Sequence, residues 1–159
     1  MTDLERLAPP GGPGRALLIG IGNDFAGDDA AGRLIARRLA GTPGFDVIES
    51  HGAAADLVAA FEGRRRVVMV DACLSGAAPG TLHRIDAHSR GLPQYLSAVS
   101  SHGIGPGQGV ALARALGLLP ERCDIIAIEA AGFALGTGLS PDVALAVERL
   151  IMALAVELA

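Results

Sequence analysis

The stretch Leu17 to Gly32 reads LLIGIGNDFAGDDAAG, and it decides how the chain folds. It starts as a short apolar run bounded by glycine, which is typical of a buried strand in a parallel sheet. Gly20 and Gly22 let the backbone turn sharply where the strand ends. Acids follow, and acids are favoured in the first turn of a helix. We therefore expect Asp28 and Asp29 at a helix start, at the carboxyl end of a central strand, where ligands bind in open α/β sheets.

A strand, a Gly-x-Gly turn and a helix also occur in dinucleotide-binding folds. Their fingerprint needs a third glycine three places after Gly22, where this chain has Phe25. The three aspartates of the stretch would also repel a pyrophosphate and attract a cation. A dinucleotide-binding α/β protein stays the weaker alternative, with Glu49 at the end of the second expected strand as the ribose ligand.

Length and composition favour one domain with one core, because the chain has 159 residues and half of them are apolar. A net charge of −4 gives no broad basic surface for nucleic acid. Residues 1–15 are rich in proline and glycine and do not resemble a signal peptide, so we expect a flexible tail there and a single domain at 16–159. No run is long enough for membrane insertion. We expect a cytoplasmic monomer.

Strand-like and helix-like segments alternate along the chain. Strands are predicted at 16–21, 45–49, 66–70, 81–85 and 123–129, and helices at 28–40, 52–62, 108–118 and from 141 onwards. The alternation predicts an α/β three-layer sandwich, with a twisted, mostly parallel five-stranded sheet between helices. The strand at 81–85 follows its predecessor after a turn too short for a crossover helix, so we expect it to be antiparallel.

Three polar side chains are predicted near one edge of this sheet. Asp29 follows the first strand, Asp71 closes the third, and His102 stands in the loop before the helix at 108–118. Two carboxylates and one imidazole suit zinc, nickel or iron, with positions left open for water or substrate. Such a site can polarise a carbonyl or activate a water. Each residue also has an ordinary structural interpretation, as a helix N-terminal acid, a loop partner or an exposed histidine.

Other candidate groups are weaker. His51, His83 and His88 have no partner at a helpful spacing, and Glu129 can simply end a strand. The serines at 100–101 lack the G-x-S-x-G pattern of a nucleophile elbow. The two cysteines of the chain match no metal or redox spacing and adjoin apolar runs, so we expect buried, inert thiols at Cys73 and Cys123.

Five motifs resemble one known family. They are GIGNDFAGDDAAG, VVMVDAC followed by PGTL, SSHGIG, LLPERCDIIAIEA and GLSPDV, in this order. Together they are similar to the hydrogenase maturation proteases, which are endopeptidases that process the large subunit of nickel–iron hydrogenases. The likeness covers residues 16–150, and the fold that it implies is an α/β sandwich like the one predicted above.

The resemblance assigns the family's metal-binding triad to Asp29, Asp71 and His102. It implies that these residues contact nickel already inserted in the hydrogenase precursor, so that the precursor supplies the metal. The endopeptidase then removes a C-terminal extension from that precursor, without a classical protease nucleophile. The expected partner is therefore the precursor of a nickel–iron hydrogenase large subunit.

One segment departs from the family pattern. Where the family usually has an Asp-Gly-Gly-Thr-like turn after the second strand, this chain has Ser50-His51-Gly52-Ala53. Because that segment can help to position the substrate, the sequence does not say which hydrogenase is served. A non-catalytic metal-checking protein with the same fold is the alternative from another functional class, although all three ligands are present.

Overall fold

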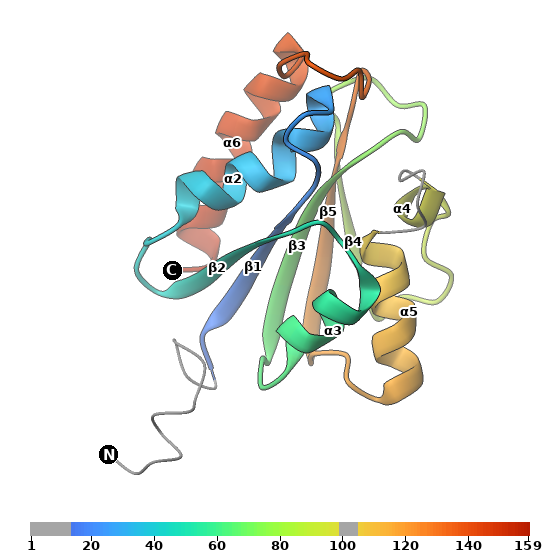
Figure 1. The fold of residues 1–159 in the computed structure, drawn as a ribbon. Coiled ribbons are helices and arrows are strands. Elements are labelled where there is room, and N and C mark those ends of the chain that lie inside the picture. The colour runs from blue at the N-terminus through green and yellow to red at the C-terminus, as the bar shows by residue number, and fades with distance from the viewer. Residues whose placement is uncertain (1–13, 99–104) are drawn as a thin grey trace.

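The computed structural model describes residues 14–98 and 105–159. The described residues form a five-stranded sheet in the order β2-β1-β3-β5-β4 (Figure 1). Its strands are β1 (Ala16–Ile21), β2 (Phe45–Ser50), β3 (Arg66–Cys73), β4 (Leu82–Asp86) and β5 (Arg122–Glu129). β4 runs antiparallel to β5, and the other neighbours are parallel. The predicted mostly parallel sheet with one antiparallel strand is confirmed.

Helices cover both faces of this sheet (Figure 1). On one face lie α2 (Ala31–Leu39) and α6 (Pro141–Glu157), and their apolar residues share a core cluster. On the other lie α3 (Ala54–Phe61), the short α4 (Tyr95–Ala98) and α5 (Pro106–Leu116), which contribute to a second cluster. A 3-10 turn, η1 (Gly27–Ala30), precedes α2. The three layers are those that the sequence predicts.

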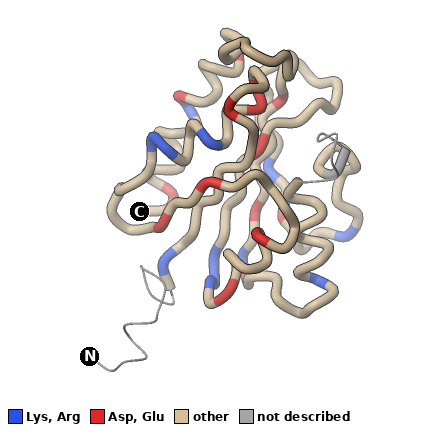
Figure 2. The backbone as a smooth tube through the Cα atoms, in the orientation of Figure 1, with Lys and Arg blue, Asp and Glu red and all other residues tan. Residues whose placement is uncertain are grey.

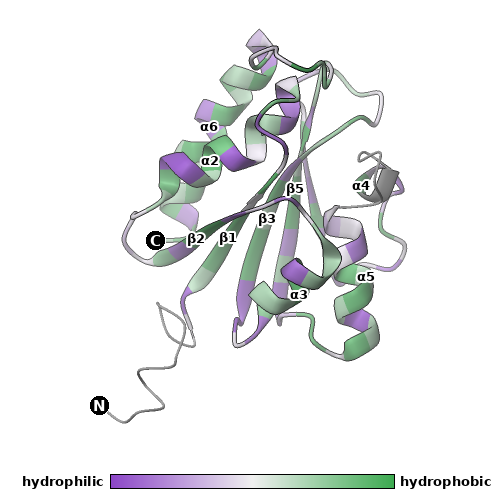
Figure 3. Ribbon diagram, in the orientation of Figure 1, coloured by the Kyte–Doolittle hydropathy of each residue, from purple (hydrophilic) through white to green (hydrophobic). Residues whose placement is uncertain are grey.

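β1 is buried on both faces, which explains its unbroken apolar sequence. Leu18 packs in the cluster with α2 and α6, whereas Leu17 and Ile19 pack in the cluster with α3 and α5. Full burial of each such side chain contributes about 1.5–3 kcal/mol to stability. Hydrophobic colour accordingly marks the central strands in Figure 3.

Several boundaries differ from the predicted ones. The helix predicted at 28–40 begins as η1 and continues as α2. β3 continues to Cys73, so Asp71 lies inside the strand and does not close it. The reason is that β5 still pairs with β3 there, whereas the pairing of β3 with β1 ends at Val70. The sequence does not predict α4, which has only four residues.

The long helix before β5 starts and ends two residues earlier than predicted. Pro106 occupies its first turn, where the fixed backbone angle of proline suits a helix start. Gly117 ends it in the left-handed conformation, with φ of 68°. The first residue of this helix therefore lies next to Gly105, where the described chain resumes.

Residues 1–13 of the expected tail lie outside the described residues. Within the described part, the Arg15 side chain contacts the Asp46 carboxylate at 3.1 Å. No helix among the described residues combines the length and the apolar character that a membrane crossing requires.

Glycines allow α2 to cross β1 and β3 at very short range. A Cβ atom added at Gly32 would lie 2.4 Å from the carbonyl oxygens of both Ile21 and Val70. One added at Gly20 would lie 2.2 Å from the carbonyl oxygen of Gly32. Because backbone atoms in a close-packed interior have little room to move, only glycine fits both positions. The contact fixes the start of α2 over the ends of β1 and β3.

Replacing Gly32 by alanine should therefore destabilise the protein. In an ordinary helix interior this change stabilises by up to about 1 kcal/mol. Here the added carbon overpacks two carbonyl groups, and we expect a loss of about 1–3 kcal/mol in the free energy of unfolding. Urea unfolding of Gly32→Ala measures it, with Gly138→Ala as the control because nothing lies within 4 Å of a carbon added there. An equal or higher stability for Gly32→Ala would contradict the close contact.

Candidate active site

Asp71 lies on β3 just beyond the last residue that pairs with β1. Its side chain is on the same sheet face as those of Met69 and Cys73, which pack in the cluster with α3 and α5. Asp71 is only 9% exposed, and its Oδ1 accepts a hydrogen bond from the Ala72 N–H at 2.8 Å. The sheet therefore holds a buried carboxylate at its carboxyl edge.

Asp29 belongs to η1, which the turn after β1 folds back over the end of that strand. The Asn23 N–H donates to the Asp29 carbonyl at 3.2 Å, and the Asp29 N–H donates to the Ala26 carbonyl at 3.0 Å. A Cβ atom added at Gly22 would lie 1.9 Å from the Asp29 carbonyl oxygen, so this turn needs glycine. The tight turn brings Asp29 to the edge where Asp71 lies.

The charge of Asp29 affects the ionisation of the Asp71 carboxyl group. Burial raises the pKa of Asp71 well above its usual range, and the negative charge of Asp29 raises it further. Burial also raises the pKa of Asp29, while a hydrogen bond from the Asn23 backbone partly offsets this rise. Asp29 and Asp71 thus form a pair of carboxyl groups that repel each other when both are ionised.

Among the described residues, no arginine forms an ion pair with Asp29 or Asp71. Figure 2 shows acidic residues at the upper end of the sheet and basic residues on α2, whereas both kinds occur at the lower end. Oxygen donors that repel each other and have no basic partner there fit a divalent cation, which would relieve the repulsion.

The other acids near this turn are already paired. The Glu49 carboxylate contacts Arg33 at 3.0 Å and Arg37 at 2.8 Å. Both arginines also contact Asp24. Glu49 is the ribose ligand in the dinucleotide-binding alternative, and its pairing with two arginines counts against that role.

Asp28 has a structural role, although it is next to Asp29. It is 2% exposed, and its Oδ1 accepts a hydrogen bond from the Ser140 N–H at 2.7 Å. Its Oδ2 accepts from the Ala131 N–H at 2.8 Å and from the Ser140 hydroxyl at 2.9 Å. Ser140 is the residue before α6, and its hydroxyl binds Asp28 and does not cap the helix. Asp28 therefore ties η1 to the start of α6.

His102, the third predicted site residue, lies outside the described residues. The described chain resumes at Gly105, whose N–H donates to the Gly52 carbonyl at 3.1 Å. Gly52 follows β2, so α5 begins at the same edge of the sheet as Asp29 and Asp71. His51, which replaces a family residue in the same turn, is exposed.

The sequence prediction missed one group of side chains. His83 was expected to have no partner, but its Nε2 lies 3.1 Å from Oε2 of Glu129. The Cys73 thiol donates to the same oxygen at 3.2 Å. The sequence predicts that β4 pairs antiparallel with a neighbour. It does not give the partner strand or the register, and both are needed to place His83 beside Glu129. Cys73 and Cys123 are both free and buried, as predicted.

Comparisons with known proteins agree with this architecture. A profile of the hydrogenase maturation protease family, HycI, matches residues 31–157. The chain belongs to the hydrogenase maturation protease family. It is therefore a hydrolase of the endopeptidase type, and the family recognised in the sequence is confirmed.

Solved structures of other members of the hydrogenase maturation protease family share the fold. HybD, a nickel–iron hydrogenase maturation protease from Thermococcus kodakarensis, is 28% identical, with a TM-score of 0.73 over 91% of this chain and 99% of that one. HycI from T. kodakarensis KOD1 is 27% identical, with a TM-score of 0.67 over 94% of each chain. HybD from E. coli, 22% identical with a TM-score of 0.65 over 90% and 93%, shows the shared fold. Curated proteins gave no match.

Replacing Asp71 by asparagine should stabilise this protease at neutral pH. The pKa of Asp71 is higher in the folded state than in the unfolded chain, so the folded state holds the proton more tightly. The contribution of Asp71 to the free energy of unfolding is fully present below about pH 4, the usual aspartate pKa. It is lost as pH rises through the pKa of Asp71 in the folded state. Asparagine has no carboxyl group to ionise, so Asp71→Asn does not lose this stability as pH rises.

The measurement is urea unfolding of the wild type and Asp71→Asn across this pH range. We expect the stability advantage of the variant to grow with pH. Glu62→Gln is the control, because Glu62 is an exposed acid at the opposite edge of the sheet. A variant no more stable than the wild type at neutral pH would show that Asp71 is not destabilised by its surroundings.

Proposed function

We propose that this protease removes a C-terminal extension from the large-subunit precursor of a nickel–iron hydrogenase after nickel has been inserted. The observation that carries the proposal is the Asp29–Asp71 pair, whose mutual repulsion favours a bound cation. Membership of the hydrogenase maturation protease family supports the reaction class. The relatives named as nickel–iron hydrogenase maturation proteases support the choice of substrate.

In this proposal the nickel arrives with the precursor. Asp29, Asp71 and His102 contact it, since carboxylate and imidazole ligands suit this metal. The position of Gly105 beside Gly52 supports a role for His102, which stands three residues earlier in the chain. Three protein ligands leave coordination positions for thiolates of the precursor. Without nickel, the two carboxylates face those thiolates and repel them, so docking is disfavoured.

The carboxyl groups can also move a proton during cleavage. In the metal-free protein burial raises the pKa of Asp29 and of Asp71, and a carboxylate oxygen that does not contact the nickel is free to accept a proton. A carboxyl group of this kind serves as general base towards a water or as general acid towards the leaving amine. We therefore propose aspartic-type endopeptidase chemistry at this pair.

Exposed apolar side chains on two touching loops, one of them just before η1, suit a protein substrate. Phe25, in the loop before η1, is 76% exposed, and Leu135 is 77% exposed. The two loops touch, because the Gly136 N–H donates to the Phe25 carbonyl at 2.9 Å. Large apolar side chains exposed together often mark interaction surfaces. We propose that they contact the precursor next to Asp29.

Nickel should decide whether cleavage occurs. Purified protease is incubated with nickel-loaded precursor, or with metal-free precursor and a chelator, and the shortened subunit is followed by mass. We expect cleavage only in the nickel arm. Asp29→Asn, Asp71→Asn and His102→Ala should each abolish it, whereas the control Glu62→Gln should not.

Two outcomes would contradict the proposal. Equal cleavage in both arms would show that nickel is not the trigger. Tight binding of nickel-loaded precursor without any shortening would favour the non-catalytic metal-checking alternative. Circular dichroism of each variant confirms that a loss of cleavage does not reflect unfolding.

Truncating the exposed apolar residues should weaken precursor binding. We expect Phe25→Ala and Leu135→Ala to raise KM for the precursor about tenfold, since each loses roughly 1–2 kcal/mol of apolar contact, and to leave kcat unchanged. Met152→Ala is the matched control, because Met152 is 73% exposed on α6. If Met152→Ala raises KM as much as Phe25→Ala does, these loops are not the docking surface.

A further inference from the structure

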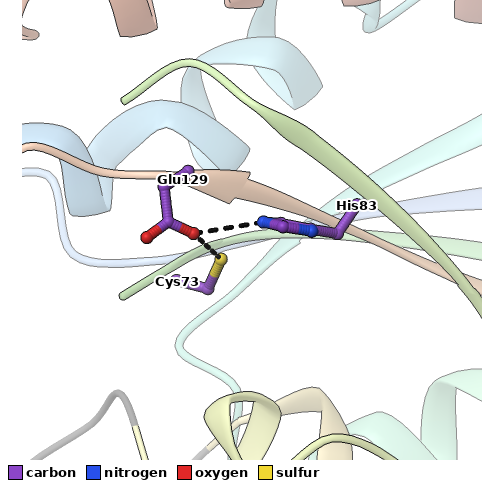
Figure 4. Close-up of side chains that lie close together, drawn as sticks. All are labelled: Cys73, His83 and Glu129. Atoms are coloured by element: carbon purple, nitrogen blue, oxygen red, sulfur yellow. Dashed lines mark hydrogen bonds and ion pairs between the residues drawn. The ribbon is translucent and has the colours of Figure 1, made fainter. Parts of the chain in front are cut away.

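A second set of chemically active side chains lies on the same sheet face as Asp71. Cys73 near the end of β3, His83 on β4 and Glu129 at the end of β5 point towards one another (Figure 4). The potential ligand atoms of the three residues all lie within 4.8 Å of one another. Neither the proposed cleavage nor the predicted triad uses them.

Strand register brings the three together. Cys73 and Glu129 are direct partners in the parallel pairing of β3 with β5. His83 is opposite Ala127 in the antiparallel pairing of β4 with β5. Because side chains two residues apart share a face, His83 and Glu129 lie on the same side of the sheet. All three ligands are therefore held by paired strands, which position side chains more accurately than loops do.

The Glu129 carboxylate is oriented by the backbone. Its Oε1 accepts hydrogen bonds from the N–H groups of Ser75 at 2.8 Å and of Gly76 at 3.0 Å. Its Oε2 is left to face the side chains of Cys73, His83 and Ser75. Carboxylates that bind metals are commonly fixed by such outer hydrogen bonds.

The hydrogen bonds around this carboxylate favour its ionised form. Burial raises the pKa of Glu129, but the hydrogen bonds from Ser75, Cys73 and His83 outweigh it and hold the pKa at about 2. The Glu129 side chain is 1% exposed and lies against a thiol and an imidazole. A thiol binds a metal as its thiolate, and an imidazole binds through a ring nitrogen.

The distances also suit a metal. Zinc binds sulfur at about 2.3 Å and nitrogen or oxygen at about 2.0–2.2 Å, so two ligand atoms in a tetrahedron are roughly 3.3–3.6 Å apart. The Cys73 Sγ is 3.2 Å and the His83 Nε2 is 3.1 Å from the Glu129 Oε2. These two distances differ from the tetrahedral spacing by a few tenths of an ångström, and the sulfur and the nitrogen lie within 4.8 Å of each other. The Ser75 hydroxyl, 2.7 Å from the same oxygen, stands where a water or the hydroxyl itself could complete the shell.

We propose that Cys73, His83 and Glu129 bind one divalent transition-metal ion, of the zinc, cobalt and nickel type, at a site separate from Asp29 and Asp71. A thiolate and an imidazole favour these metals over magnesium or calcium. When the metal binds, the Cys73 thiol loses its proton to solvent. Its sulfur then ligates the metal, and its hydrogen bond to Glu129 is lost. The ion joins three adjacent strands at the edge that carries Asp71.

Cobalt(II) titration tests this site, because thiolate ligation gives a charge-transfer absorption band in the near ultraviolet. Full-length wild-type protein should develop the band and saturate at one equivalent. The chain has two cysteines, so Cys123→Ser is a matched control that should keep the band. Cys73→Ser should lose it, and Asp71→Asn should retain it. His83→Gln should weaken cobalt affinity at least about tenfold, the size of effect typical of changes at metal sites.

Three results would overturn the proposal. They are the absence of the band in the wild type, its survival in Cys73→Ser, and its loss in folded Asp71→Asn, which would show that the metal site is not separate from Asp71. His83 is partly exposed, so His83→Gln should fold even if Cys73→Ser does not. Unchanged cobalt affinity in His83→Gln then overturns the proposal by itself. These readouts do not depend on endopeptidase activity, so they stand or fall separately from the proposed cleavage.

Discussion

The close approach of α2 to β1 and β3 fixes the geometry of the active edge. The carbonyl groups of Ile21 and Val70 occupy the space that a side chain at Gly32 would need, so the helix can lie directly on the strands. The turn before it is equally tight, since Gly22 leaves room for the Asp29 carbonyl. These contacts between backbone atoms leave η1 little freedom. They hold Asp29 near Asp71 although the two charges repel each other.

The structure tolerates that repulsion because neighbouring groups secure the same turn. Asp28 accepts two hydrogen bonds from Ser140, just before α6, and one from Ala131, so η1 is anchored independently of Asp29. At the carboxyl edge, Asp28 thus stabilises the fold, whereas Asp29 and Asp71 destabilise it when both are ionised. Groups with strongly raised pKa values that the fold retains are typical of functional sites. The Cys73–Glu129–His83 group extends the same edge across β5 to β4.

Much of the architecture was predictable from local signals. β1 is apolar at every position that the two layers cover, and the short turn before β4 allows only an antiparallel return. The end of β3 was not predictable, because Asp71 and Cys73 remain in the strand only through pairing with β5, a strand distant in sequence. The encounter of His83 with Glu129, 46 residues apart, likewise depends on sheet order and register. In the site, the position of Asp29 at the end of β1 was predictable, because the glycine turn is visible in the sequence. The role of His102 stays a prediction.

The measurement that tests the account most directly is the pKa of Asp71 in the wild type and in Asp29→Asn. Carbon-13 NMR of the aspartate carboxyl groups, titrated against pH, gives both values on the folded protein. We expect a pKa for Asp71 well above the usual aspartate range in the wild type, and a lower one once the charge of Asp29 is removed. An identical pKa in both proteins would show that the two acids do not act on each other, and would contradict the paired site.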